Sequence, residues 1–184
     1  MHSQDLSESE IFPIVDPEGN VIGKATRKEC HSGSRLLHPV VHLHVFNKQG
    51  KLFLQQRALT KYIQPGKWDT AVGGHRDYGE TVEQALAREA REEIGIIDFV
   101  PVKLFHYVYN SDKESELVDT YCTITDQESF TCDPAEVIEG KFWSIQEITD
   151  ALGSGMLTPN FEDEFKLLIK TLPDVFPKLF NAKE

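Results

Sequence analysis

Short apolar segments, many alternating with polar residues, follow one another along most of the chain. They predict strands where Gly, Pro, Asn and Asp bound them, and helices where apolar residues recur every three or four positions. Strands mixed with a few helices favour an α/β or α+β sandwich. The pair Gly73-Gly74 is expected to end the strand that is predicted at residues 68–72. Strands are expected at residues 11–15, 21–27, 40–46, 51–56, 68–72, 100–109, 117–124 and 140–144, and helices at 81–94, 147–152 and 161–172.

The segment from Thr81 to Ile94 has the strongest helical pattern. Thr81 and Gln84 have the spacing of a capping box, and Gly95 stands where glycine commonly ends a helix. Apolar residues recur at every fourth position, so they form one stripe that can pack against a sheet. The stripe consists of Val82, Leu86, Ala90 and Ile94.

Three glutamates gather on a neighbouring face of this helix. Glu89, Glu92 and Glu93 stand at i, i+3 and i+4, where like charges repel by about a few tenths of a kcal/mol per pair. Clustered oxygen ligands are what Mg²⁺ or Mn²⁺ requires, and a bound ion would remove the repulsion. The alternative is a solvated acidic face relieved by Arg88 and Arg91.

The spacing around these glutamates resembles a known family motif. Residues 74–96 read GHRDYGETVEQALAREAREEIGI. Five residues separate Gly74 from Glu80, and seven more lead to Arg88. The segment resembles the Nudix box, G-x5-E-x7-R-E-U-x-E-E-x-G-U, where U is aliphatic. Each fixed position is matched, with Ala90 a small residue at an aliphatic site.

The resemblance implies an α/β fold, the Nudix α/β/α sandwich with a mixed β-sheet and a loop-helix-loop catalytic motif. It also implies hydrolysis of a diphosphate linkage in a nucleoside-diphosphate-linked or related small molecule, with Mg²⁺ or Mn²⁺ as cofactor. Metal ions neutralise the charge that builds on phosphoryl oxygens during such cleavage.

The family roles can be placed on this sequence position by position. The metal ligands would be Glu89, Glu92 and Glu93, with the backbone carbonyl of Gly74. Glu80 and Arg88 would pair to support the loop. Glu92, Glu93 and Arg88 are the expected catalytic residues, and which carboxylate acts as the base is left open.

Further segments resemble the isopentenyl-diphosphate-isomerase-like branch of the Nudix family. In the true isomerases, a cysteine just before the equivalent of Gly74-His75 transfers protons to and from an alkene. Here Gly73 stands at that position and has no side chain to carry a proton, which favours hydrolysis over isomerisation. The similar segments are Asp16 to Gly23, His31 to His38, Val45-Phe46-Asn47, Gln56-Arg57, Lys61, Pro65-Gly66, Trp68-Asp69 and Gly74-His75.

The same resemblance implies further binding residues. Arg57 and Lys61 match positions that bind diphosphate in the isomerases; the alternative is that they are surface cations. His31, His38 and His75 match metal-ligand histidines; otherwise they are hydrogen-bonding residues of loops or strands.

Four more positions carry open alternatives. Glu116 and Asp119 lie where the family often has another acidic ligand or base, and the sequence does not choose between them. His42 and His44 alternate in one strand and are read as structural or cleft-lining residues.

Composition limits the classes of partner. The 184 residues include 19 Lys and Arg against 30 Asp and Glu, a net charge of −11. Such a surface repels nucleic acid and anionic membranes, whereas a metal ion can reverse the local charge for a small anionic substrate. The partner is therefore expected to be a small diphosphate compound, without broad nucleic-acid or membrane binding. A homodimer is left open.

The chain is expected to contain one domain at residues 11–172, with a flexible segment at 1–10 and a C-terminal tail at 173–184. Residues 1–10 lack the features of a signal peptide, and no apolar run approaches the roughly 18 residues that span a bilayer. Three cysteines without CxxC spacing favour reduced thiols in a cytoplasmic protein. Besides a hydrolase, a nucleotide or metabolite sensor on the same fold and an isomerase are considered.

Overall fold

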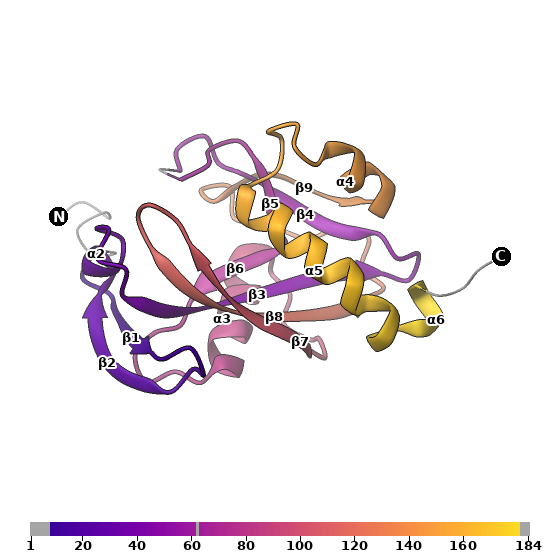
Figure 1. Ribbon diagram of the computed structural model, residues 1–184. Helices are drawn as coiled ribbons and strands as arrows, with labels where there is room; N and C mark the ends of the chain where they lie inside the picture. Colours follow the sequence, from indigo (N-terminus) through magenta and orange to yellow (C-terminus); the bar gives the residue numbers. More distant parts are fainter. Residues whose placement is uncertain (1–7, 62, 181–184) are drawn as a thin grey trace. The chain divides into compact units, whose positions relative to one another are not determined.

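A computed structural model describes residues 8–61 and 63–180 (Figure 1). The strands are β1 (Ile11–Val15), β2 (Val21–Thr26), β3 (Leu37–Asn47), β4 (Leu52–Arg57), β5 (Trp68–Thr70), β6 (Val72–His75), β7 (Val102–Asn110), β8 (Ser115–Thr125) and β9 (Val137–Trp143). The helices are α2 (Arg27–Cys30), α3 (Val82–Ile94), α4 (Ile145–Ala151), α5 (Pro159–Val175) and α6 (Pro177–Phe180). None of the described helices combines the length and the apolar character that a membrane-spanning helix needs.

The described strands form two sheets. β1 and β2 pair as an antiparallel hairpin. The larger sheet has the order β5-β4-β3-β8-β7, with β6 paired to β3 and β9 paired to β4. A mixed sheet with flanking helices confirms the predicted α/β class.

The structure corrects some of the predicted boundaries. The break in the strand at 68–72 falls at Ala71, and Gly73-Gly74 lie inside β6, so their prediction as a strand break was wrong. The short helix α2 was missed, although Thr26 and Glu29 form a capping box at its start. Helices α5 and α6 continue to residue 180 where a tail was expected from 173. Residues 1–7 of the predicted flexible segment and 181–184 of the tail lie outside the described residues.

Helix α3 begins and ends as its sequence predicts. The backbone N–H of Gln84 donates to Thr81 Oγ1 (3.2 Å), and the N–H of Thr81 donates to the Gln84 side chain (2.9 Å). At the other end Gly95 has φ 69°, a left-handed conformation that suits glycine. The predicted apolar stripe is buried at Leu86, Ala90 and Ile94.

The described chain forms two compact units. The first comprises residues 8–42, 73–89 and 105–120, and it holds the β1–β2 hairpin, α2 and β6. A small core of Phe12, Ile14 and Cys30 lies under the hairpin, with Ala25 and Leu36 packed against it.

The second unit comprises residues 43–61, 63–72, 90–104 and 121–180 and holds the larger core. Helix α5 packs Phe161, Phe165, Leu168 and Leu172 into this core with Leu52 and Leu54 of β4 (Figure 1). Trp68 and Trp143 pack edge to face with ring centroids 5.1 Å apart. Phe180 of α6 packs against the same core, which explains why the chain stays helical beyond residue 172.

Candidate active site

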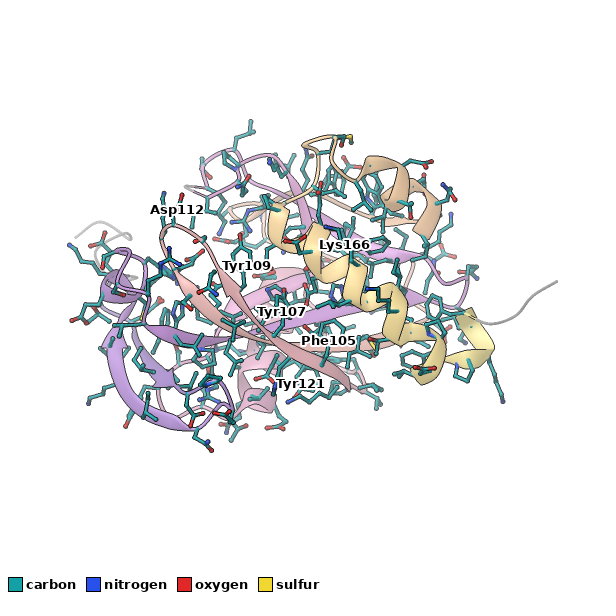
Figure 2. All side chains as sticks on the ribbon, viewed as in Figure 1. Phe105, Tyr107, Tyr109, Asp112, Tyr121 and Lys166 are labelled. Atoms are coloured by element: carbon teal, nitrogen blue, oxygen red, sulfur yellow. The ribbon has the colours of Figure 1, made fainter. Side chains whose placement is uncertain are left out.

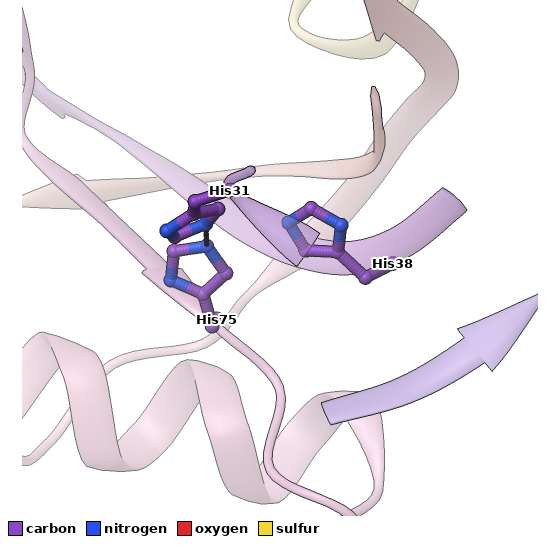
Figure 3. A group of neighbouring side chains, drawn as sticks. All are labelled: His31, His38 and His75. Atoms are coloured by element: carbon purple, nitrogen blue, oxygen red, sulfur yellow. Dashed lines mark hydrogen bonds between the residues drawn. The ribbon is translucent and has the colours of Figure 1, made fainter. Parts of the chain in front are cut away.

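Three predicted histidines converge in the first unit. His31 follows α2, His38 lies in β3, and His75 ends β6. One ring nitrogen from each lies within 4.8 Å of the others, the spacing of ligands around one metal ion (Figure 3). The Nε2 atoms of His31 and His75 are 3.1 Å apart. The structure therefore brings together residues that are 44 positions apart in the sequence.

Neighbouring groups fix the orientation of these rings. Phe12 of β1 is fully buried and stacks on His75 with ring centroids 4.4 Å apart and 3° between the planes. His38 Nδ1 lies 2.9 Å from the Leu36 carbonyl, as expected for an N–H donor. His38 Nε2 is then left buried with no hydrogen-bond partner within the described residues. An unpaired buried nitrogen beside two other imidazoles fits a metal ligand.

The environment favours neutral imidazoles, the form that binds metal. Burial, the Arg27 guanidinium and His38 lower the pKa of His31 to about 4. Burial also lowers the pKa of His38, against the opposing effect of the Leu36 carbonyl. Burial and the surrounding charges, with Arg27 foremost, hold the pKa of His75 well below its usual value.

Two carboxylates approach the same cluster. Glu114 Oε2 lies 3.4 Å from His31 Nε2, and Glu116 Oε1 lies 3.8 Å from His75 Nε2. Of the two acidic residues left open by the sequence, Glu116 is therefore the one beside the histidines. Glu114 was missed. Its only sequence signal was its closeness to Glu116, because Glu114 lies in the turn just before β8 and not in the strand itself.

The β7–β8 hairpin positions these carboxylates. Its four-residue turn closes with a hydrogen bond from the Ser111 N–H to the Glu114 carbonyl (3.0 Å). The N–H of Gly33 donates to the Lys113 carbonyl (2.8 Å), so the loop after His31 docks on the hairpin tip. Figure 2 shows Asp112 at this tip and the aromatic side chains of β7, Phe105, Tyr107 and Tyr109, along the strand.

Arg88 organises the predicted box residues of the first unit. It donates to both oxygens of Glu80, at 2.9 Å each, and to Glu89 Oε1 at 2.6 Å. A fourth hydrogen bond runs from Arg88 to the His75 carbonyl (2.9 Å). The hydrogen bond from Arg88 is the main cause that lowers the pKa of Glu80. The Glu80–Arg88 pair thus connects the loop before α3 with the Glu89 carboxylate and with the backbone of His75.

Gly74 makes room for the carboxylate of Glu89. A Cβ atom at position 74 would overlap the Glu89 carboxylate, so only glycine leaves this space. A carboxylate that rests against a bare backbone segment, held by an arginine, fits the ligand role expected for it.

The other two box glutamates belong to the second unit, on the last turn of α3. Gln55 Nε2 donates to Glu93 Oε2 (2.7 Å), and the Glu93 carbonyl accepts from the Asp133 N–H (3.2 Å). Glu92 is exposed. Because α3 is one continuous helix, Glu92 and Glu93 follow Glu89 at adjacent positions on its surface.

The two predicted diphosphate-binding cations, also in the second unit, have carboxylate partners. Arg57 Nη1 lies 3.2 Å from Asp69 Oδ2, and its Nε donates to the Ile63 carbonyl (3.2 Å). Lys61 forms an ion pair with Glu136. Their role in diphosphate binding stays a prediction.

Comparison with known proteins relates this arrangement to one family. The family model described as NUDIX domain matches residues 36–162. An isopentenyl-diphosphate Delta-isomerase from Brevibacterium linens is 32% identical over 148 residues, covering 78% of this chain and 81% of the relative. Another from Streptomyces avermitilis is 36% identical over 118 residues, covering 64% of this chain and 60% of the relative.

Solved structures agree on the fold. The crystal structure of protein DR0079 from Deinococcus radiodurans matches with a TM-score of 0.73 at 22% sequence identity. The match covers 88% of this chain and 99% of that protein. At this level of identity the likeness concerns the fold.

Proposed function

The chain belongs to the Nudix family, in its isopentenyl-diphosphate-isomerase-like branch, and on this premise we propose that it is a divalent-metal-dependent hydrolase. Its substrate would be a small molecule that contains a diphosphate linkage, such as a nucleoside-diphosphate-linked compound. The products would be two phosphorylated compounds, or one product and inorganic phosphate.

The observation that carries this proposal is that position 73 has no side chain, whereas all the box residues are present. Gly73 is exposed in β6 and offers no side chain that could move a proton at carbon. Cys30 is buried in the hairpin core, where burial raises its pKa to about 11. Cys122 is buried in the core of the second unit, with its pKa raised to about 12. Protonated, buried thiols of this kind are poor proton-transfer groups.

The divalent ion of the proposed hydrolase would bind at the box residues. The Glu89 carboxylate rests in space that a side chain at Gly74 would fill, and Arg88 and Gln55 hold Glu89 and Glu93 in place. Glu89, Glu92, Glu93 and the Gly74 carbonyl would hold the ion. When bound, Mg²⁺ or Mn²⁺ supplies charge neutralisation at phosphoryl oxygens and acidifies a water ligand. The protein's own part is to orient these oxygens and to keep Glu80 and Arg88 paired beneath them.

The histidine cluster would provide a further metal site. His31, His38 and His75, with Glu114 and Glu116, form a donor set that suits Mn²⁺ or Zn²⁺. His38 Nε2, which has no hydrogen-bond partner among the described residues, supports this assignment. Its place in the proposed reaction would be to hold the substrate's phosphate end.

Isomerisation of isopentenyl diphosphate is the second candidate, because curated relatives carry that name. Gly73 opposes it, since a glycine cannot replace the proton-transferring cysteine of that reaction. Proton exchange from deuterated water into isopentenyl diphosphate separates the two candidates. Exchange without hydrolysis would favour the isomerase.

The test of the hydrolase proposal is product release by the purified protein with Mg²⁺ and with Mn²⁺. The panel holds nucleoside di- and triphosphates, nucleotide sugars, dinucleoside polyphosphates and prenyl diphosphates. Glu93→Gln is expected to lower turnover by about 100-fold or more without unfolding the protein. Glu83→Gln, an exposed glutamate of the same helix, is the matched control. Equal rates in Glu93→Gln and wild type would refute the assignment. Metal-dependent binding without release would favour the sensor.

A further inference from the structure

Asp69 accepts three hydrogen bonds in the second unit, and one of them comes from Arg57. Its Oδ1 atom accepts from the Thr158 hydroxyl (2.9 Å) and from the backbone N–H of Thr70 (2.8 Å). Its Oδ2 atom accepts from Arg57 Nη1 (3.2 Å). The two carboxylate oxygens therefore have separate partners. One is bound by the backbone of β5 and by the start of α5, and the other is bound by a guanidinium of β4.

The backbone around Asp69 is held on both sides of β5. On one side Asp69 pairs with Gln55 of β4. On the other side the Trp68 N–H donates to the Met156 carbonyl (2.9 Å), and the Thr158 N–H donates to the Trp68 carbonyl (3.0 Å). Thr158 is also the N-cap of α5. A carboxylate that is fixed to such rigid elements can hold a flexible partner in one orientation.

Arg57 uses only part of its guanidinium for contacts within the protein. Its Nε atom donates to the Ile63 carbonyl (3.2 Å), and its Nη1 atom donates to Asp69. Its Nη2 atom makes no hydrogen bond to a described residue, and the side chain is 25% exposed. A guanidinium that is bound through two of its nitrogens still has N–H groups for a phosphoryl oxygen.

Arg57 lies on the side of β4 that carries one of the box glutamates. Alternate residues of a strand share a face, so Arg57 and Gln55 point to the same side of β4. On that side Gln55 Nε2 donates to Glu93 Oε2 (2.7 Å). Asp69 is paired with Gln55, so it belongs to this side as well. A phosphoryl group near Glu93 would therefore meet Arg57 on the same side of the sheet.

We propose that Asp69 is a positioning residue that orients Arg57, so that Nη2 donates to a phosphoryl oxygen of the diphosphate substrate. The inference rests on the proposed function, because it takes a diphosphate as the substrate and Arg57 as one of its binding residues. A mobile arginine loses rotamer freedom when it binds a ligand, whereas an arginine that is already held loses less. Asp69 thus lowers the entropic cost of binding the diphosphate.

Charge alone predicts the opposite effect of Asp69 on binding. Its carboxylate offsets the positive charge of Arg57 and repels a phosphate. If charge decided the outcome, removal of this carboxylate would strengthen the binding of a diphosphate. If orientation decides it, the same removal weakens binding. The sign of the change in affinity therefore separates the two explanations.

The test measures the dissociation constant of methylenediphosphonate, a non-hydrolysable diphosphate, by isothermal titration calorimetry in the presence of Mg²⁺. Asp69→Asn keeps a carbonyl oxygen for the contacts of Oδ1, but it presents an NH₂ group to Arg57 in place of an acceptor. It is expected to raise the dissociation constant about three- to tenfold, the loss that corresponds to immobilising one long side chain on binding. Asp163→Asn is the matched control, because it removes the same charge from an exposed position of α5 and should leave binding unchanged.

A double-mutant cycle distinguishes positioning from a purely structural role. Arg57→Met removes the guanidinium and should raise the dissociation constant about tenfold or more. In the Arg57→Met background, Asp69→Asn should add no further loss, because the group that Asp69 orients is absent. A purely structural role of Asp69 at the start of α5 would weaken binding equally in both backgrounds.

Arg57→Lys tests the same idea without a change at Asp69. Lysine keeps the positive charge, but its ammonium group lacks the planar fork that binds the Ile63 carbonyl, Asp69 and a phosphate in one fixed geometry. This variant should therefore lose nearly as much affinity as Arg57→Met.

The outcomes separate this inference from the function on which it rests. Unchanged or tighter binding by Asp69→Asn overturns the role of Asp69, and so do additive losses in the cycle. Wild-type affinity in Arg57→Lys or Arg57→Met also overturns it, because binding would then need no oriented guanidinium. In all these cases the wild type still binds a diphosphate, so the proposed function stands. Absence of binding by the wild type overturns the diphosphate function and this inference together.

Discussion

Replacement of Gly74 by alanine should impair catalysis far more than folding. The new Cβ would overlap the carboxyl carbon and both oxygens of Glu89, well inside the roughly 3.5 Å at which carbon atoms normally meet. The Glu89 carboxylate is the end of a flexible side chain, so it can move away by on the order of 1 Å. That movement breaks its 2.6 Å hydrogen bond to Arg88, whose other N–H groups hold Glu80 and the His75 carbonyl.

The two consequences differ in size. A shift of about 1 Å in a positioning group can cost about 100-fold in rate, which corresponds to about 2.7 kcal/mol of transition-state stabilisation. Overpacking a partly exposed site costs about 1–3 kcal/mol of stability at most. Gly74→Ala is therefore expected to stay folded and to lose about 100-fold in kcat/KM.

The assay pairs urea unfolding with turnover of whichever panel compound the wild type hydrolyses. Gly79→Ala is the control, because Gly79 has φ 95° and no heavy atom within 4 Å of its added Cβ. That variant should lose about 1 kcal/mol of stability to backbone strain while its turnover is unchanged. Turnover of Gly74→Ala within threefold of wild type would refute the reasoning.

Three further predictions test other contacts. His38→Ala should lower Mn²⁺ stoichiometry by one ion in a metal titration; an unchanged value contradicts the histidine site. Arg88 lowers the pKa of Glu80 below its ordinary value of 4.5, so the pair contributes its full stabilisation at pH values above 4.5. That stabilisation is lost as the pH falls through the lowered pKa of Glu80 in the folded protein. In Glu80→Gln the urea concentration at the midpoint of unfolding should therefore depend less on pH in that acid range than it does in wild type. Glu164→Leu should cost about 1–3 kcal/mol of stability, because the buried Thr70 hydroxyl would lose the carboxylate that accepts its hydrogen bond, and adding Thr70→Val should restore most of the loss; urea unfolding measures both.

Much of the fold could be predicted because local and global signals agree. Helix α3 has its capping box, its terminal glycine and its apolar stripe within 15 residues, and the structure places all three as expected. Strand boundaries were less certain. Gly73-Gly74 indicated a break because glycine weakens strands, yet both glycines serve close approach by side chains from elsewhere in the chain. A sequence pattern does not contain such long-range contacts.

The site, too, has a part that the sequence could predict and a part that it could not. The box positions follow from fixed spacing along one helix, so their relative places were predictable. The convergence of His31, His38 and His75 depends on how α2, β3 and β6 pack, and only the resemblance suggested it. Glu114 escaped notice because its approach to His31 depends on the turn of the β7–β8 hairpin.

The two glycines and Arg88 make the faces of β6 interdependent. Arg88 donates to Glu89 on one face and to the backbone carbonyl of His75, whose ring belongs to the other. A shift of that carbonyl would move the ring that stacks on Phe12. The box residues therefore help to set the geometry of the histidine cluster through the backbone of the short strand β6. In such an arrangement a side chain at position 74 would displace Glu89 and thereby disturb Arg88, whereas loss of the Arg88 guanidinium would disturb both faces directly.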